Sequence, residues 1–200
     1  MSADQRRKWP AVRLTFLLPM VIAIAGAAWL SVTVYNELHW KQFAVVIPGK
    51  VYRSGLLKGH QLESAIESLK LRTVICLDAK EADHERKLCD EHGIRLLSFD
   101  MHSSGEGRPE DYAEVVRTLN DPQSQPVLVH CRAGVARTGA SVALYRMSVQ
   151  GWTFDQAISE LKSFERKGRC EPELQRMITK IYEEKLKSGL ATESKASSTR

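Results

Sequence analysis

The chain has 200 residues, 43% of them hydrophobic and 26% charged, so it is long enough for one globular domain with a sizeable core and a smaller segment at one end. Its net charge of +5 is modest, and no long basic stripe with interleaved aromatic residues is present, which argues against a nucleic-acid-binding protein. The four cysteines match neither a zinc-binding spacing nor a Cys-x-x-Cys pair, so we expect no metal site and no cofactor.

An uncharged apolar stretch covers residues 14–35, and a basic segment, 1–13, precedes it. This stretch is long enough to cross a bilayer core of about 30 Å, so it predicts one transmembrane helix. The alternative is a cleaved signal peptide, because Ala23, Ala25 and Ala27 supply small-residue cleavage sites. Since the positive charge lies before the stretch, we expect a single-pass membrane protein whose remaining chain lies on the extracytoplasmic side.

The rest of the chain alternates between β-favouring runs and amphipathic runs. Residues 36–49 are expected to form a juxtamembrane linker, and 50–187 a folded domain. The alternation predicts an α/β fold in which helices flank a central, mostly parallel sheet on both faces. The expected strands are 51–53, 73–77, 94–99 and 127–129, and the expected helices are 61–69, 80–92, 109–119, 138–150, 154–164 and 171–187.

Residues 125–139 read QPVLVHCRAGVARTG. The pattern indicates a short buried strand that ends at a turn of functional residues. Small residues after Cys131 leave backbone N–H groups free to surround an anion, and Arg137 can grip two oxygens of a phosphate at once. A helix begins directly afterwards, and its N-terminus also favours negative charge, including a thiolate. The predicted phosphate-binding residues between the cysteine and the arginine are Arg132, Ala133, Gly134, Val135 and Ala136.

The last stretch of the chain, residues 188–200, is rich in Ser, Thr and Lys and lacks apolar anchors. It is therefore predicted to be a disordered tail.

His130, Cys131, Arg137 and Thr138 resemble the signature of the protein tyrosine and dual-specificity phosphatases, in which His and Cys are followed by five residues, Arg, and Ser or Thr. The resemblance implies that the cysteine attacks phosphorus, the arginine binds the transferring phosphoryl oxygens, and the hydroxyl eases departure of the thiolate. His130 is expected to order the loop by hydrogen bonding. The domain 50–187 is then a phosphatase catalytic domain.

The opening YRSG, followed by a helix and the strand TVICL, also resembles the start of bacterial and fungal dual-specificity phosphatases. In that class an aspartate on a loop before the cysteine protonates the leaving group and later activates water. Asp100, directly after a predicted strand, is the candidate, with Glu106 and Asp111 as alternatives. In some relatives a second cysteine on a neighbouring strand forms a protective disulfide with the nucleophile, and Cys76 lies on such a strand; the alternative is a small buried side chain.

These observations predict a membrane-anchored phosphatase that hydrolyses phosphomonoesters through a phosphocysteine intermediate. Phosphotyrosine, phosphoserine, phosphothreonine and lipid or inositol phosphates are all compatible substrates, and Arg132 either selects acidic or multiply phosphorylated ones or is simply solvated. One alternative is a phosphate-binding module without turnover. Another is a sulfurtransferase that resembles rhodanese. The resemblance is weaker here, because the rhodanese-like loop is one residue shorter between its cysteine and its closing basic residue.

Overall fold

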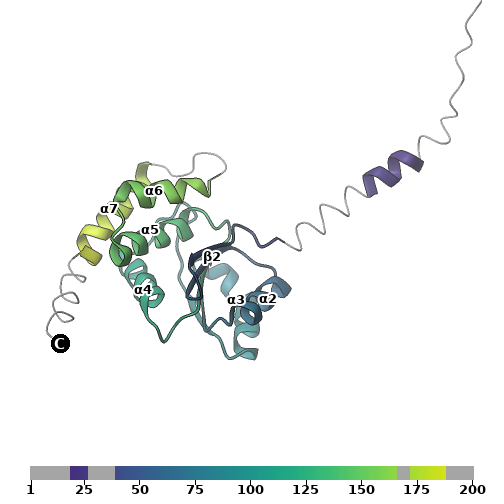
Figure 1. The fold of residues 1–200 in the computed structure, drawn as a ribbon, viewed down its shortest axis with the longest axis horizontal. Coiled ribbons are helices and arrows are strands. Elements are labelled where there is room, and N and C mark those ends of the chain that lie inside the picture. The colour runs from purple at the N-terminus through teal and green to yellow at the C-terminus, as the bar shows by residue number, and fades with distance from the viewer. Residues whose placement is uncertain (1–18, 27–38, 166–171, 188–200) are drawn as a thin grey trace, which may run out of the picture. The chain divides into compact units, whose positions relative to one another are not determined.

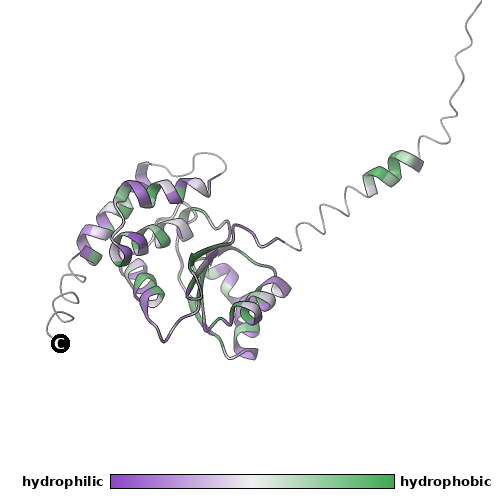
Figure 2. Cartoon of the chain, in the orientation of Figure 1, coloured by the Kyte–Doolittle hydropathy of each residue, from purple (hydrophilic) through white to green (hydrophobic). Residues whose placement is uncertain are grey.

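The computed structural model describes residues 19–26, 39–165 and 172–187 (Figure 1). The predicted basic segment 1–13 and tail 188–200 lie outside these ranges. Of the predicted transmembrane helix 14–35, only residues 19–26 are described, as a short apolar helix (Figure 2). No helix within the described ranges combines the length and the apolar character needed to cross a membrane. The chain divides into two units, Met1–His39 and Trp40–Arg200, and the second contains the sheet.

The second unit is built on a five-stranded sheet of order β1-β2-β5-β3-β4. Strand β2 (Val51–Gly55) pairs in parallel with β5 (Val127–Cys131), β5 with β3 (Thr73–Cys76), and β3 with β4 (Arg95–Ser98). The predicted parallel arrangement is thus correct for these four strands. Strand β1 (Ala44–Ile47) pairs antiparallel with β2, so the sheet as a whole is mixed.

Strand β1 falls within the stretch 36–49, for which we predicted a linker. Its four residues, AVVI, are apolar and mostly β-branched, and Gly49, with φ of +72°, turns the chain back into β2. A four-residue edge strand gives little periodic signal, which explains the difference from the prediction.

Helices cover both faces of the sheet, as the alternating pattern predicted (Figure 1). One face carries α2 (Gly59–Leu69) and α3 (Ala79–Glu91), which enclose a core of mostly apolar side chains with Tyr52, Val74 and Leu128 from the strands. The other face is covered by α4 (Pro109–Asn120), α5 (Ala136–Gln150), α6 (Phe154–Ser163), α7 (Pro172–Ile181) and a π-helical turn (Tyr182–Leu186).

Alternate residues of each strand therefore enter different cores. In β5, Val127, Val129 and Cys131 face the larger group of helices, whereas Leu128 contacts α2 and α3. Helix α5 follows β5 directly and is buried along residues 137–148, which makes it the central helix of its layer. The connection between β5 and α5 is thus held between the carboxyl end of the sheet and a buried helix.

Candidate active site

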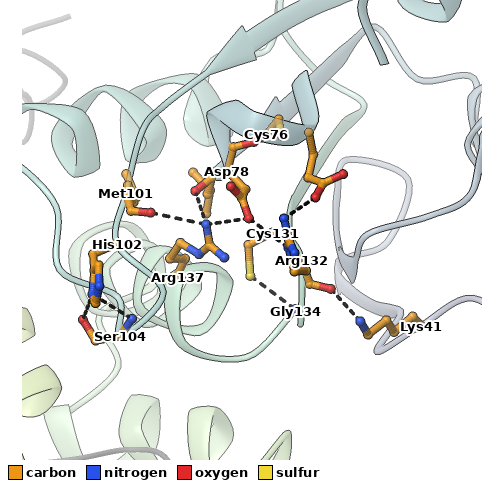
Figure 3. Close-up of polar contacts among 12 residues, drawn as sticks. Lys41, Cys76, Asp78, Met101, His102, Ser104, Cys131, Arg132, Gly134 and Arg137 are labelled. Carbon is orange, nitrogen blue, oxygen red and sulfur yellow. Dashed lines mark hydrogen bonds and ion pairs between the residues drawn. The ribbon is translucent and has the colours of Figure 1, made fainter. Parts of the chain in front are cut away.

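The connection between β5 and α5 forms a tight loop over residues 131–137 that closes around the sulfur of Cys131 (Figure 3). Cys131 is the last residue of β5 and is only 2% exposed. The backbone N–H of Gly134 donates a hydrogen bond to Cys131 Sγ at 3.2 Å. Gly134 has a φ of +75°, and an added Cβ atom would meet the backbone of Gly55 at 2.6 Å, so no larger residue fits there.

The carbonyl groups of the loop are held by the end of β2 and its surroundings. The carbonyl oxygen of Arg132 accepts hydrogen bonds from Lys41 Nζ at 2.7 Å and from the backbone N–H of Leu56 at 3.3 Å. The carbonyl oxygen of Gly134 accepts one from Arg53 Nη2 at 2.8 Å. In a trans peptide the C=O and N–H groups point in opposite directions. Fixing the carbonyls outward therefore turns the following N–H groups toward the interior of the loop, as an anion-binding nest requires.

Arg137 occupies the first turn of α5 and is 5% exposed. Its Nη1 atom forms an ion pair with Asp78 Oδ2 at 3.0 Å and donates hydrogen bonds to the carbonyl oxygens of Leu77, at 3.1 Å, and Met101, at 3.3 Å (Figure 3). All three contacts involve Nη1. The other guanidinium donors have no such contact among the described residues and remain for a bound anion.

Arg132 does not extend freely into solvent, although its side chain is 58% exposed. Its guanidinium donates to the carboxylate of Glu81, in the first turn of α3, and lies 3.5 Å from Asp78 Oδ2. The carboxylate of Asp78 therefore lies between the two arginines of the loop. Neither alternative for Arg132, substrate selection or a solvated side chain, included this pairing, in which two carboxylates largely offset its positive charge.

His130 lies on the opposite face of the sheet from Cys131. Its Nε2 atom is 3.1 Å from Glu85 Oε2 of α3, and both side chains are buried. The expected ordering role is consistent with this pair, which fixes the imidazole directly before the nucleophile.

Cys76 is the register partner of His130, so it too is on the face away from Cys131. The disulfide with Cys131 that the resemblance implied for Cys76 is therefore excluded by the strand register.

The side chains of Cys76, Glu85 and His130 bring three potential metal ligands within 4.8 Å of one another. The imidazole and the carboxylate are already at direct hydrogen-bond distance. The Cys76 thiol donates to the carbonyl oxygen of Asp78 at 3.2 Å. Burial, reinforced by the charge of Glu85, raises the pKa of Cys76 well above its usual value, so this cysteine is a thiol at neutral pH. These hydrogen bonds account for the close approach of the three side chains without a metal ion.

The candidate acids lie on the segment after β4. Asp100 is exposed, and its backbone forms an isolated antiparallel bridge with Asp78, which places it beside the loop. Glu106 is exposed, 3.9 Å from His102 Nδ1. Asp111 accepts two hydrogen bonds from Arg108, at 2.9 and 2.7 Å, in the first turn of α4. This bidentate pair occupies the Asp111 carboxylate, so Asp111 is the weakest of the three candidates.

Thr138 follows Arg137 in α5 and is fully buried. Its Oγ1 atom has no hydrogen-bond partner among the described residues. A buried hydroxyl without a partner is costly, and a nearby bound group would satisfy it. The role implied by the resemblance, assisting departure of the thiolate, stays a prediction.

Five residues that contact the loop or its histidine were missed by sequence reasoning, namely Lys41, Arg53, Asp78, Glu81 and Glu85. Asp78 had a usable signal, because it follows a buried parallel strand at the edge where β5 also ends. Arg53 also had one, as a single charge inside a strand whose five residues are all buried. Glu85 had none, since it is one of many charged residues in α3.

A family model described as "Tyrosine phosphatase family" matches residues 38–199. An inositol diphosphatase of Oryza sativa subsp. japonica is 38% identical over 129 residues, which cover 61% of this chain and 56% of the relative. The dual specificity protein phosphatase TpbA of Pseudomonas aeruginosa is 33% identical over 116 residues, covering 56% and 50%. The chain thus spans about half the length of these curated relatives.

Solved structures show the same fold. The core catalytic domain of the PP-IP phosphatase SIW14 from S. cerevisiae aligns with a TM-score of 0.66 and 21% identity, covering 77% of this chain and 93% of that one. A cysteine-to-serine variant of P. aeruginosa TpbA in complex with phosphotyrosine aligns with a TM-score of 0.54 and 25% identity, covering 76% and 93%.

Proposed function

Because the chain belongs to the tyrosine phosphatase family, by the match over residues 38–199, we propose that it is a cysteine-dependent phosphatase acting on phosphomonoesters. The observation that carries this proposal is the loop around Cys131. Its sulfur accepts a backbone N–H from Gly134, and Arg137 closes the loop with donors left for an anion.

The proposed reaction has two displacements at phosphorus. The Cys131 thiolate attacks, the phosphorus–ester oxygen bond breaks, and the leaving oxygen takes a proton from an acid. A water molecule then gives a proton to the resulting carboxylate and displaces the sulfur, which releases inorganic phosphate and restores the thiolate. Arg137 and the loop amides bind the three non-bridging oxygens in both steps, where charge stabilisation and positioning dominate the rate. In the second step, the Thr138 hydroxyl is proposed to ease the departure of the Cys131 thiolate from phosphorus.

Asp100 is the proposed acid, because it is solvent-accessible and its backbone is bridged to Asp78 beside the loop. The Asp100→Asn variant is expected to lose about 10²-fold in kcat on a phosphotyrosine peptide. A smaller loss is expected on p-nitrophenyl phosphate, whose leaving group needs little protonation. Steady-state kinetics on the two substrates measure this difference. Glu106→Gln, in the same segment, is the matched variant; a larger loss there than in Asp100→Asn would transfer the acid role to Glu106.

The charges at the loop favour a substrate with one phosphate, of which phosphotyrosine is our first candidate. Asp78 and Glu81 offset Arg132, and Asp78 also contacts Arg137. A ligand with several phosphates needs additional uncompensated cations around the loop. The phosphotyrosine complex of TpbA, a relative of the same fold, supports this candidate.

An inositol diphosphate is the second candidate substrate. It is favoured by the names of several curated relatives, among them the rice protein with 38% identity. Lys41 adds one exposed cation at the rim of the loop, with its Nζ atom on the carbonyl oxygen of Arg132. This single cation is weaker support than the charge balance described above.

The test combines an activity assay with trapping of the phosphocysteine intermediate. It uses the full chain in detergent, with a reductant and a metal chelator. We expect hydrolysis of a phosphotyrosine peptide, with kcat/KM at least about 10-fold above that for an inositol diphosphate. After rapid quenching, mass spectrometry should place phosphate on the Cys131 peptide. Phosphate binding without turnover would support the binding-module alternative. A persulfide on Cys131 after thiosulfate treatment would support the sulfurtransferase alternative.

The proposal includes a membrane anchor over residues 14–35, with the phosphatase domain on the extracytoplasmic side. It is supported by the uncharged apolar run and the basic residues before it. Fractionation of cells expressing the full chain, with protease accessibility from each side, reports both the anchor and its orientation.

A further inference from the structure

A buried arginine lies beneath the loop and has no part in the reaction as described so far. Arg53 is the middle residue of β2 and is 1% exposed. Its Nη2 atom donates to the carbonyl oxygen of Gly134 at 2.8 Å, and its guanidinium lies 3.6 Å from the centroid of the Phe164 ring. Its Nε and Nη1 atoms have no hydrogen-bond partner among the described residues. A buried, incompletely paired guanidinium is costly to folding, so its presence requires a compensating role.

The charge of Arg53 acts on the nucleophile. The pKa of Arg53 is lowered to about 10, mainly by burial and to a smaller extent by the nearby Arg146, while Glu160 and Cys131 oppose that shift by favouring the charged form. The side chain is therefore a cation at neutral pH. Attraction between two charges is mutual, so a cation that is stabilised by negative charge on Cys131 also stabilises that negative charge.

The hydrogen bond of Arg53 acts on the loop amides. It fixes the carbonyl of the peptide that joins Gly134 to Val135, and the N–H of the same peptide must point the opposite way, toward the interior of the loop. Gly134 itself has a positive φ and can adopt other conformations at little cost, so this peptide needs an external constraint. Among the described residues, Arg53 is the side chain bonded to this carbonyl.

We propose that Arg53 is a positioning residue of the phosphatase reaction: it holds the Gly134–Val135 peptide with its N–H toward the bound phosphate and fixes a positive charge beneath the loop that carries the Cys131 sulfur. This inference rests on the proposed function for its effect on turnover. Its effect on the Cys131 sulfur is independent of the substrate. The Phe164 ring and strand β2 hold the guanidinium, so this cation has a fixed position inside the domain, unlike a cation on a flexible side chain at the surface.

The experiment uses three variants of the full chain. Arg53→Met removes both the charge and the donor, and Arg53→Gln removes the charge but keeps a donor. The matched control is Arg146→Met, because Arg146 is a second buried arginine that pairs with Glu160 and lies over Trp152, away from the loop carbonyls. The readouts are the pH at which iodoacetamide alkylation of Cys131 is half-maximal, inhibition by vanadate, kcat/KM and the melting temperature.

Both Arg53 variants are expected to move the alkylation midpoint upward by about one pH unit. Arg53→Met should also weaken vanadate inhibition and lower kcat/KM by about 10- to 100-fold. Arg146→Met should lower the melting temperature without moving the alkylation midpoint. An Arg53→Gln midpoint equal to that of the unmodified chain would overturn the inference, even where Arg53→Met does not fold. If the unmodified chain shows no turnover but the midpoint shifts, the proposed function fails while the role of Arg53 toward the sulfur stands.

Discussion

Replacing Cys131 with serine is expected to lower kcat on a phosphotyrosine peptide by at least about 10⁴-fold, because a serine hydroxyl is not ionised at neutral pH. The substitution changes one buried atom at the end of β5, so the loop should keep its shape. The Gly134 N–H, which donates to the sulfur, can donate to the hydroxyl oxygen instead. Peptide binding, measured by calorimetry, should therefore persist while phosphate release, measured by a coupled assay, disappears.

The control for this prediction is Cys89→Ser. Cys89 is as buried as Cys131 but lies in α3, in the core enclosed by α2 and α3. Burial raises the pKa of Cys89 to about 11, so it is a thiol at neutral pH and has no part in the reaction. Cys89→Ser should lower the melting temperature, since a hydroxyl enters an apolar core, and should keep kcat. Turnover that survives Cys131→Ser but not Cys89→Ser would reject the assignment of the nucleophile.

The nucleophile and the phosphate-binding arginine could be predicted because they lie on one continuous segment. A buried strand, a run of small residues and a helix start within fifteen residues define the loop locally, and Cys131 and Arg137 are brought together by that segment alone. The partners that hold this loop come from elsewhere. Asp78 and Arg53 reach it only because β3 and β2 flank β5 in the sheet, and the sequence contains no local signal for that strand order.

The position of Cys76 shows that strand register could not be predicted from the sequence. Placing it on a strand next to β5 was correct, but whether it faces Cys131 depends on the register to a single residue. Because successive side chains point to opposite faces, a shift of one residue exchanges the two possibilities. A strand can be predicted from its composition, whereas its register is decided by pairing across the sheet. Of the two alternatives for Cys76, the disulfide is excluded for this reason, and the small buried side chain remains.

The second large effect is expected from Arg137→Lys, which should lower kcat by about 10³-fold or more. One Arg137 nitrogen is used by Asp78 and by the carbonyls of Leu77 and Met101, which leaves the others for two phosphoryl oxygens. A lysine has one nitrogen, so it cannot hold the carboxylate and the phosphoryl group in fixed positions together. Pre-steady-state measurement of phosphate transfer to Cys131 would detect the loss at the first chemical step.

The control for this substitution is Arg146→Lys, on the same helix. Arg146 is also buried and bound to a carboxylate, with its Nη2 atom 2.6 Å from Glu160 Oε1, but its contacts are away from the loop. It should therefore lose stability with little change in kcat. If Arg137→Lys transferred phosphate as fast as the unmodified chain, charge alone would suffice at this position, and the two-oxygen grip inferred from its free donors would be wrong. Slow transfer with an unchanged affinity for inorganic phosphate would instead confine the role of the guanidinium to the transition state, in which the bonds to phosphorus are longest and the charge on the phosphoryl oxygens must be held in place.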